Sequence, residues 1–246
     1  MSIFVGNCVD KMKDMNSFIY DVIVTSPPYN NGTKYDNYAD SLSWSSYEKF
    51  ANSWVEQVYK VLTPKGSLFL NIGVKPAQLQ SIYLKALCSS GLIVQNTIVW
   101  VKHISVAEDK SFGHFKPVNS NRYINNCFEL IYHCTIDGDV PLDRLAIGVE
   151  YADKSNISRW STGNDKRCRG NVWFVPYKTI RSKSNHPAGF PSRIPEMCIL
   201  LHGVERCKRI LDPFMGVGST LRAAKKLNID CDGIELSPSY VGLAEA

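Results

Sequence analysis

A short buried strand that ends in two prolines is the feature that most constrains this chain. Tyr20–Val24 is a β-branched run typical of a strand, and Thr25-Ser26-Pro27-Pro28-Tyr29-Asn30 follows it directly. Because proline has no backbone N–H and fixes φ near about −65°, the strand has to end there, and the residue before each proline stays extended. The sequence therefore predicts a rigid loop at the carboxyl end of a strand, where open α/β sheets bind ligands.

The groups on this loop suit the chemistry of an exocyclic amino group on a nucleobase. Such a nitrogen is a poor nucleophile because its lone pair is delocalised into the ring. The hydroxyl of Ser26 and the carbonyls of Pro27 and Pro28 can accept its N–H groups, and the ring of Tyr29 can stack on the base. The alternative is a simple Pro-Pro turn in which Tyr29 only fills space.

Composition and apolar patterning predict one α/β domain with elaborated loops. The chain has 246 residues, 44% of them hydrophobic, and alternating apolar runs favour a mainly parallel, doubly wound sheet. No run reaches the ~18 apolar residues that a membrane span needs, and the start lacks a secretory signal. We therefore expect a cytoplasmic protein that binds no membrane. The eight cysteines form no Cys-x-x-Cys pair, so neither a metal site nor a disulfide framework is predicted.

The expected elements can be given by their ranges. We expect strands near 3–7, 20–24, 67–72, 93–101, 127–133, 209–211 and 231–234, and helices near 9–15, 47–62, 77–88, 192–202 and 221–228. Ser45 or Ser46 is the expected cap of the second helix. The polar loop Asn31–Tyr38 either closes over a substrate or is a mobile surface connection. Residues from about Asp137 to Asn185 show no clean periodicity.

A basic and aromatic stretch lies between Lys154 and Asn185. It holds eight Lys and Arg residues against Asp165 alone, interleaved with aromatic side chains. This pattern is typical of a surface that binds a phosphate backbone, although a solvated charged face is the alternative. The candidate DNA contacts here are Lys166, Arg167, Arg169, Trp160 and Trp173.

A glycine loop near the end of the chain predicts a cofactor site. Asp212-Pro213-Phe214-Met215-Gly216-Val217-Gly218-Ser219-Thr220 follows the strand 209–211 and leads into a helix. Leu221 replaces the third glycine of a dinucleotide fingerprint, and no Gly-Lys-Ser/Thr follows, which excludes a P-loop. Glu235, at the end of the next strand, is placed to bind two ribose hydroxyls. An ordinary βαβ turn is the alternative.

The order of these motifs predicts a circularly permuted sheet. The nucleotide-binding half begins near Arg209, and the chain ends at Ala246. This half can be completed only if the N-terminal strand lies beside the C-terminal segment in space.

Three motifs in this order resemble the β-class DNA amino-methyltransferases, which use S-adenosylmethionine. They are the Ser-Pro-Pro-Tyr loop, His186-Pro187-Ala188-Gly189-Phe190-Pro191 and the glycine loop. The family usually has Gly-Asp where this chain has Gly6-Asn7, and Asp10 could substitute. The resemblance implies a Rossmann-like fold with a catalytic half (1–102), a loop-rich recognition insert (103–185, with a returning core strand near 127–133) and a cofactor half (186–246). It also implies cofactor contacts from Thr25, Asp212, Phe214, Gly216, Gly218, Ser219, Thr220, Glu235 and Phe190.

The same resemblance predicts the reaction. We expect a site-specific methyltransferase that flips a base out of double-stranded DNA and methylates the N4 amino group of cytosine, since Ser26 precedes the two prolines. Phe128 is either a second stacking partner for the base or a buried strand residue. Adenine N6 is the alternative target, an RNA or protein amide methyltransferase is a rival, and a non-catalytic nucleic-acid-binding module is more distant. Restriction-modification, with a cognate endonuclease and a monomeric or homodimeric enzyme, is expected by analogy.

Overall fold

A computed structural model describes residues 1–106, 109–112, 121–122, 124, 126–160, 164–176 and 189–245 of the chain. The side chains of 103–106, 109–112, Trp160 and Glu245 are not part of this description. Some residues of the predicted basic stretch and of the His-Pro-Ala motif lie outside it, namely Tyr177, Lys178, Arg181, Lys183, His186, Pro187 and Ala188.

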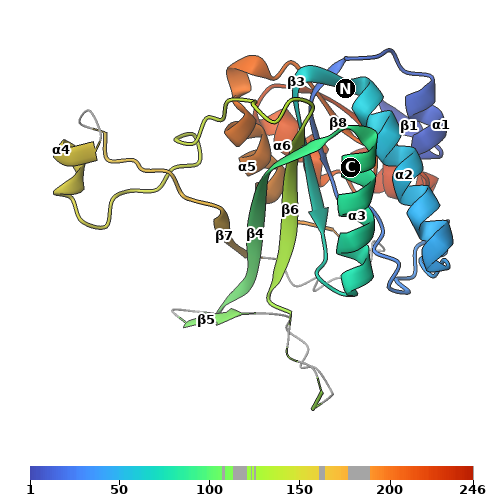
Figure 1. Ribbon diagram of the computed structural model, residues 1–246, viewed down its shortest axis with the longest axis horizontal. Coiled ribbons are helices and arrows are strands. Elements are labelled where there is room, and N and C mark those ends of the chain that lie inside the picture. Colours follow the sequence, from blue (N-terminus) through green and yellow to red (C-terminus); the bar gives the residue numbers. More distant parts are fainter. Residues whose placement is uncertain are drawn as a thin grey trace.

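A mainly parallel sheet forms the centre of the described structure (Figure 1). The strand order is β1-β9-β8-β2-β3-β6-β4-β5, and β7 also pairs with β4. Neighbouring strands from β1 to β3 are parallel, whereas β6 runs antiparallel between β3 and β4. The strands are β1 (Ile3–Val5), β2 (Tyr20–Thr25), β3 (Leu62–Ile72), β4 (Ile93–Val106), β5 (Asp109–Phe112), β6 (Phe128–Thr135), β7 (Val172–Pro176), β8 (Arg209–Asp212) and β9 (Asp230–Glu235).

Helices cover both faces of this sheet, as the doubly wound prediction requires. Helices α2 and α3 lie on one side and α5 and α6 on the other (Figure 1), and a separate hydrophobic core fills each side. The described helices are α1 (Cys8–Lys13), α2 (Trp44–Val61), α3 (Ala77–Ser90), α4 (Asn156–Trp160), α5 (Arg193–His202), α6 (Ser219–Lys226) and α7 (Pro238–Glu245), with a 3₁₀ turn at Val204–Arg206.

The predicted circular permutation is confirmed by the pairing of the first and last strands. β1 runs parallel to β9, with Ile3 opposite Gly233 and Val5 opposite Glu235. The amide of Gly6 donates to the carbonyl of Glu235 at 2.8 Å, which continues the pairing beyond β1. The N-terminal strand thus completes the sheet beside the nucleotide-binding half.

The chain leaves the neighbouring strands β2 and β8 towards opposite faces of the sheet. The chain leaves β8 through α6 towards β9, and it leaves β2 through α2 towards β3 on the opposite face. In an open α/β sheet, such a switch point leaves a crevice above the strand ends. The Ser-Pro-Pro-Tyr loop and the glycine loop both begin there.

The structure corrects three local predictions. Helix α2 is capped by Ser43, whose Oγ accepts the amide of Ser46 at 3.2 Å, and not by Ser45 or Ser46. Strand β3 already begins at Leu62, the residue at which the helix near 47–62 was expected to end. Within the stretch without clean periodicity, Val172–Pro176 forms β7, a parallel neighbour of β4.

A buried polar cluster connects α5 to the sheet. The Oγ of Ser67 lies 2.9 Å from His133 Nε2 and 2.9 Å from His202 Nδ1. Burial lowers the pKa of His133 to about 3 and that of His202 to about 4, from an ordinary value of 6.5. Both imidazoles are therefore neutral at neutral pH.

These histidines should make the protein sensitive to acid. Between roughly pH 4 and pH 6.5 the unfolded chain binds protons that the folded chain excludes, so stability falls as pH falls. Each histidine should cost roughly 2 kcal/mol of unfolding free energy between about pH 7 and about pH 5. The variant His202→Gln can still form a hydrogen bond with Ser67. Urea unfolding at both pH values should show that its loss of stability between about pH 7 and about pH 5 is smaller than that of the wild type by roughly 2 kcal/mol. An unchanged pH dependence would contradict this account.

Candidate active site

A cavity of about 860 Å³ lies at the carboxyl ends of β2, β8 and β9. Its wall contains Ser26 and Tyr29 from the first half of the chain together with Gly216 and Glu235 from the last part. Sites for small ligands usually have volumes of about 300–1,000 Å³. The fold therefore brings the two predicted motifs to one cavity of suitable size.

The glycine loop has backbone conformations that favour glycine. Gly216 and Gly218 have φ values of 53° and 79°, and the amide of Gly216 donates to Oε2 of Glu235 at 2.8 Å. The amide of Ser237 donates to Oε1 of Glu235 at 2.8 Å. A carboxylate oxygen can accept a second hydrogen bond, so two ligand hydroxyls can still bind this fixed carboxylate. Burial raises the pKa of Glu235 above its ordinary range.

Asp212 lies at the start of the same loop, buried but in the cavity wall. Its Oδ1 accepts from Thr25 Oγ1 at 2.8 Å and from the amide of Phe214 at 3.1 Å. Its Oδ2 accepts from Thr220 Oγ1 at 2.6 Å. Burial raises the pKa of Asp212 to about 6, although these hydrogen bonds oppose the shift. At neutral pH the cavity thus has a carboxylate that can attract a cation.

The predicted cofactor residues divide into two groups. Asp212, Phe214, Gly216, Ser219, Glu235 and Phe190 belong to the cavity wall. Thr25 and Thr220 are fully buried and orient Asp212 from below, so the direct cofactor contact expected of them is corrected to a supporting one. Gly218 is not in this wall either; a Cβ there would lie 3.0 Å from the Cβ of Ala244.

Aromatic residues that were not predicted complete the wall near the glycine loop. They are Tyr35, Tyr38, Phe50 and Tyr240. Apolar and aromatic surfaces suit an adenine ring, and the two carboxylates suit ribose hydroxyls and an ammonium group. The residues present therefore fit S-adenosylmethionine. The density of tyrosines in 29–38 was the available sequence signal.

The loop after Asn30 is held in place by one buried carboxylate. Asp40 accepts from the amides of Asn30, Asn31 and Thr33 at 2.7–3.1 Å. Asn30 exchanges two hydrogen bonds with the backbone of Leu42, at 2.7 and 2.9 Å. These contacts favour the first of the two interpretations left open by the sequence, a loop that lies over the site.

The Ser-Pro-Pro-Tyr loop is fixed on both sides. The hydroxyl of Tyr47 donates to the carbonyl of Pro28, so this carbonyl already has a partner. Among the described residues, no donor reaches the carbonyl of Pro27. A Cβ at Gly73 would lie 3.0 Å from Cδ2 of Tyr29, so Gly73 permits close packing against the tyrosine ring.

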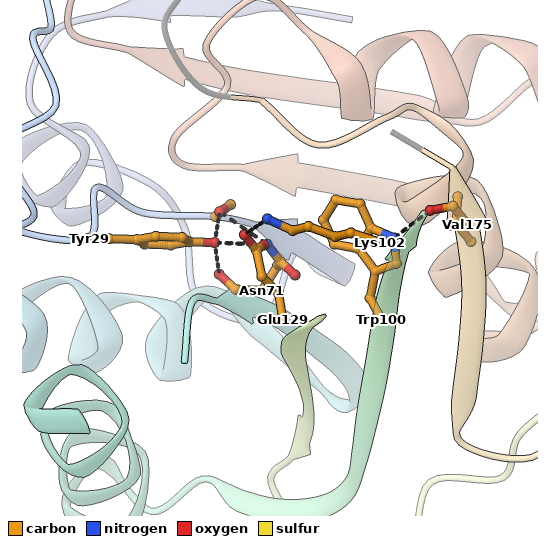
Figure 2. Close-up of polar contacts among 7 residues, drawn as sticks. Tyr29, Asn71, Trp100, Lys102, Glu129 and Val175 are labelled. Atoms are coloured by element: carbon orange, nitrogen blue, oxygen red, sulfur yellow. Dashed lines mark hydrogen bonds and ion pairs between the residues drawn. The ribbon is translucent and has the colours of Figure 1, made fainter. Parts of the chain in front are cut away.

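A polar network joins this loop to β3, β4 and β6 (Figure 2). The hydroxyl of Tyr29 lies 2.9 Å from Ser26 Oγ, 2.9 Å from Asn71 Nδ2 and 3.2 Å from Glu129 Oε2. Glu129 also accepts from Asn71 Nδ2 at 2.7 Å and forms an ion pair with Lys102. Burial and the charge of Glu129 raise the pKa of Tyr29 well above its ordinary range. We did not predict Asn71, Lys102 or Glu129, because nothing in the sequence shows that β3, β4 and β6 are neighbours in the sheet.

Some of the residues predicted to contact nucleic acid are exposed, and others are buried. Phe128 is 37% exposed and lies in the cavity wall. Lys166 and Arg167 are exposed, whereas Arg169 is half-buried and donates to the carbonyl of Ile147 at 2.9 Å. Lys154 pairs with Glu150 and Asp165, which neutralises part of the basic stretch.

Trp173 is the clearest correction among these residues. It is 1% exposed, belongs to the core beside α5, and donates from Nε1 to the carbonyl of Gly170 at 3.1 Å. Its place on β7 points it into the core, so it cannot stack on DNA. Trp160 ends α4, and its side chain lies outside the described part of the chain.

The described residues contain neither a candidate metal site nor a helix that could span a membrane. No cluster of His, Cys, Asp or Glu there could hold a metal ion. No helix in the same ranges is long and apolar enough to cross a membrane.

Comparison with known proteins identifies the family. Residues 20–246 match the family model for N6/N4 methyltransferases, described as DNA methylase. The chain belongs to this DNA amino-methyltransferase family. It is 25% identical over 244 residues to the type II methyltransferase M.HpaI of Haemophilus parainfluenzae, with 98% of this chain and 71% of that protein covered. It is 29% identical over 256 residues to M.ScaI of Streptomyces caespitosus, covering 97% and 78%.

Solved structures of DNA methyltransferases have the same fold. The PvuII DNA methyltransferase (cytosine-N4-specific) superimposes with a TM-score of 0.72 at 16% identity, covering 99% of this chain and 84% of that one. M1.HpyAVI, solved as a complex with SAM, superimposes with a TM-score of 0.65 at 20% identity, covering 99% and 97%. This amino-methyltransferase family uses S-adenosylmethionine as the methyl donor.

We expect Glu235→Gln to weaken binding of S-adenosylmethionine by at least tenfold. The variant removes charge from the only carboxylate that the cavity wall offers at the end of β9 in the described structure, and each lost charged hydrogen bond costs roughly 1.5–3 kcal/mol. Calorimetry on the DNA-free protein measures the change. Glu205→Gln, at an exposed residue of the 3₁₀ turn, is the matched control. Equal affinities in the two variants would contradict the assignment.

Proposed function

We propose that the protein is a site-specific DNA methyltransferase that methylates the N4 amino group of a cytosine flipped out of the duplex. One observation supports this proposal most strongly. Ser26 and Pro27 share a cavity wall with Gly216 and Glu235, so a methyl donor and a base can lie side by side. A base within a duplex cannot reach such an enclosed site, and enzymes of this kind extrude it.

The residues of the wall have distinct tasks in this proposal. The carbonyl of Pro27 and Oγ of Ser26 accept the two N–H groups of the target nitrogen, which directs its lone pair towards the cofactor site. Phe128 and Tyr29 border the space for the base. When bound, S-adenosylmethionine supplies a methyl group on a positively charged sulfur, so the target nitrogen needs no enzyme nucleophile. Asp212 and Glu235 hold the cofactor.

The choice of cytosine rests on the residue before the two prolines. A Ser before the two prolines resembles the cytosine-N4 version of this motif, whereas adenine-modifying relatives more often carry Asp or Asn there, and the short hydroxyl of Ser26 can accept from the amino group. The likeness to the cytosine-N4-specific PvuII enzyme, a matter of fold at 16% identity, agrees with this choice. Adenine N6 is the alternative, because its amino group makes the same demands on the site.

The type II relatives suggest a role in restriction-modification. M.HpaI, M.BglII and M.ScaI are named type II methyltransferases. We propose that this chain likewise marks one sequence in double-stranded DNA against a cognate endonuclease, acting as a monomer or a homodimer.

Mass spectrometry of nucleosides tests the target. Plasmid DNA incubated with the protein and S-adenosylmethionine should contain N4-methylcytosine, and Ser26→Ala should reduce the yield at least tenfold while leaving cofactor affinity unchanged. N6-methyladenine in place of N4-methylcytosine would overturn the choice of base. Methylation of RNA or protein alone would overturn the DNA assignment, and cofactor binding with no transfer would favour a non-catalytic module.

The exposed cations at 166–167 should contribute to DNA affinity. Replacing Lys166 and Arg167 with Gln should weaken binding and reduce the slope of log affinity against log salt by up to about 0.9 per lost phosphate contact. Lys208→Gln with Lys225→Gln is the matched control, because these exposed cations lie at the amino ends of β8 and β9, opposite the cavity. Equal slopes for both double variants would show that the basic stretch is a solvated charged face that does not contact DNA.

A further inference from the structure

The network around Tyr29 has one consistent arrangement of hydrogen atoms. A phenol oxygen can donate one hydrogen bond and accept two. The amide nitrogen of Asn71 can only donate, so it donates to Tyr29 at 2.9 Å. The carboxylate of Glu129 can only accept when it is ionised, so Tyr29 donates to it at 3.2 Å. A charged acceptor is favoured over the carbonyl of Asn71, which lies further away at 3.4 Å.

This arrangement decides the direction of the bond between Ser26 and Tyr29. Because the single hydrogen of Tyr29 goes to Glu129, the hydroxyl of Ser26 has to donate to Tyr29 at 2.9 Å. The reverse direction would place two acceptors, the Tyr29 oxygen and Glu129, against each other without a hydrogen. The lone pairs of Ser26 Oγ therefore point away from Tyr29, and Ser26 lies in the cavity wall. Asn71 Nδ2 lies 3.4 Å from this oxygen, but its two hydrogens go to the nearer Tyr29 and Glu129. Ser26 is thus prepared to accept a hydrogen bond from a ligand N–H.

The charge of Glu129 is compensated from the opposite side. Lys102 forms an ion pair with it, and only 13% and 12% of the two side chains are exposed. The ammonium group of Lys102 also lies 5.2 Å from the ring centre of Trp100, whose Nε1 is anchored to the carbonyl of Val175 at 2.9 Å (Figure 2). Lys102 on β4, whose ammonium group lies beside the anchored ring of Trp100, therefore holds the carboxylate in place.

We propose that Glu129 is a positioning residue that fixes the polarity of the Ser26–Tyr29 pair and receives, through that pair, the proton released by the target amino group. This inference rests on the proposed amino methylation. It assigns the carboxylate at the start of β6, which lies in the cavity wall, a role in the reaction that acts through Tyr29 and Ser26.

The proton transfer balances without any additional reactant. The lone pair of the amino nitrogen forms the new N–C bond, and the electrons of the broken C–S bond stay on sulfur. The nitrogen then carries a positive charge and one proton too many. That proton moves to Ser26 Oγ, the Ser26 proton moves to Tyr29, and the Tyr29 proton moves to Glu129. Ser26 and Tyr29 end neutral as they began, and Glu129 becomes a carboxylic acid beside Lys102.

Glu129→Gln tests this role because it keeps the size and an acceptor oxygen but loses the basic group. We expect kcat to fall by roughly 10²-fold, the usual lower range for loss of an acid–base group. Affinity of the DNA-free protein for S-adenosylmethionine should stay within about twofold of wild type, because the polar contacts of Glu129 go to Tyr29, Asn71 and Lys102 and not to the glycine loop. Glu129→Asp should restore part of kcat. A kcat within about threefold of wild type in Glu129→Gln would overturn the proposal.

A double-mutant cycle separates the relay from general support of the site. Tyr29→Phe keeps the ring and removes the hydroxyl, so it breaks the path between Ser26 and Glu129. In the Tyr29→Phe background, Glu129→Gln should change kcat by less than about twofold, because both substitutions interrupt one path. Independent, multiplicative losses would show that Glu129 does not act through Tyr29.

A measurement without cofactor or DNA completes the test. In protein labelled with ¹³C at the tyrosine Cζ, the Tyr29 resonance, assigned by its absence in Tyr29→Phe, should move in Glu129→Gln because the charged acceptor is lost. An unchanged resonance would show that Tyr29 does not donate to Glu129. Failure of the wild type to methylate DNA would instead refute the proposed function, and this resonance would still report on the network.

Discussion

The hydrogen bond between Thr25 and Asp212 links the two ends of this enzyme. It joins Oγ1 of the last residue of β2 to Oδ1 of the last residue of β8 over 2.8 Å, although the two residues are 187 positions apart in the chain. Since β2 leads into the Ser-Pro-Pro-Tyr loop and β8 into the glycine loop, this contact fixes the positions of the two loops relative to each other. Removing Asp212 from water is unfavourable, as its raised pKa indicates, and three donors offset that cost.

The loops above this contact are held by side chains from the scaffold. Asp40 ties together three amides of the loop after Tyr29, and Tyr47 on α2 holds the carbonyl of Pro28. Preorganised groups of this kind lose little entropy when a substrate binds. The Glu129–Lys102 pair extends the same principle to β4 and β6, because it orients the hydroxyls of Tyr29 and Ser26 from two rigid strands.

Within the described part of the basic stretch, fewer side chains are available to bind DNA than the sequence suggested. Trp173 and Val175 face the core, because β7 pairs with β4 and every second residue of a strand points to the same side. Lys154 pairs with two acidic side chains, and Arg169 donates to a backbone carbonyl. The cations of 154–169 that remain most available for phosphate are therefore Arg159, Lys166 and Arg167. A count of basic residues could not reveal this, because pairing depends on neighbours in space.

The sequence alone determined the features that depend on local chemistry. The two prolines ended β2, the glycines shaped the loop after β8, and the order of the motifs required β1 to pair with β9. Only the tertiary structure decided which side chains share the cavity. Thr25 and Thr220 became supports of Asp212, whereas Asn71, Lys102 and Glu129 came together from three strands. Sequence spacing reports the periodicity within a strand, but contacts between strands depend on register and sheet order, which are fixed only when the whole sheet packs.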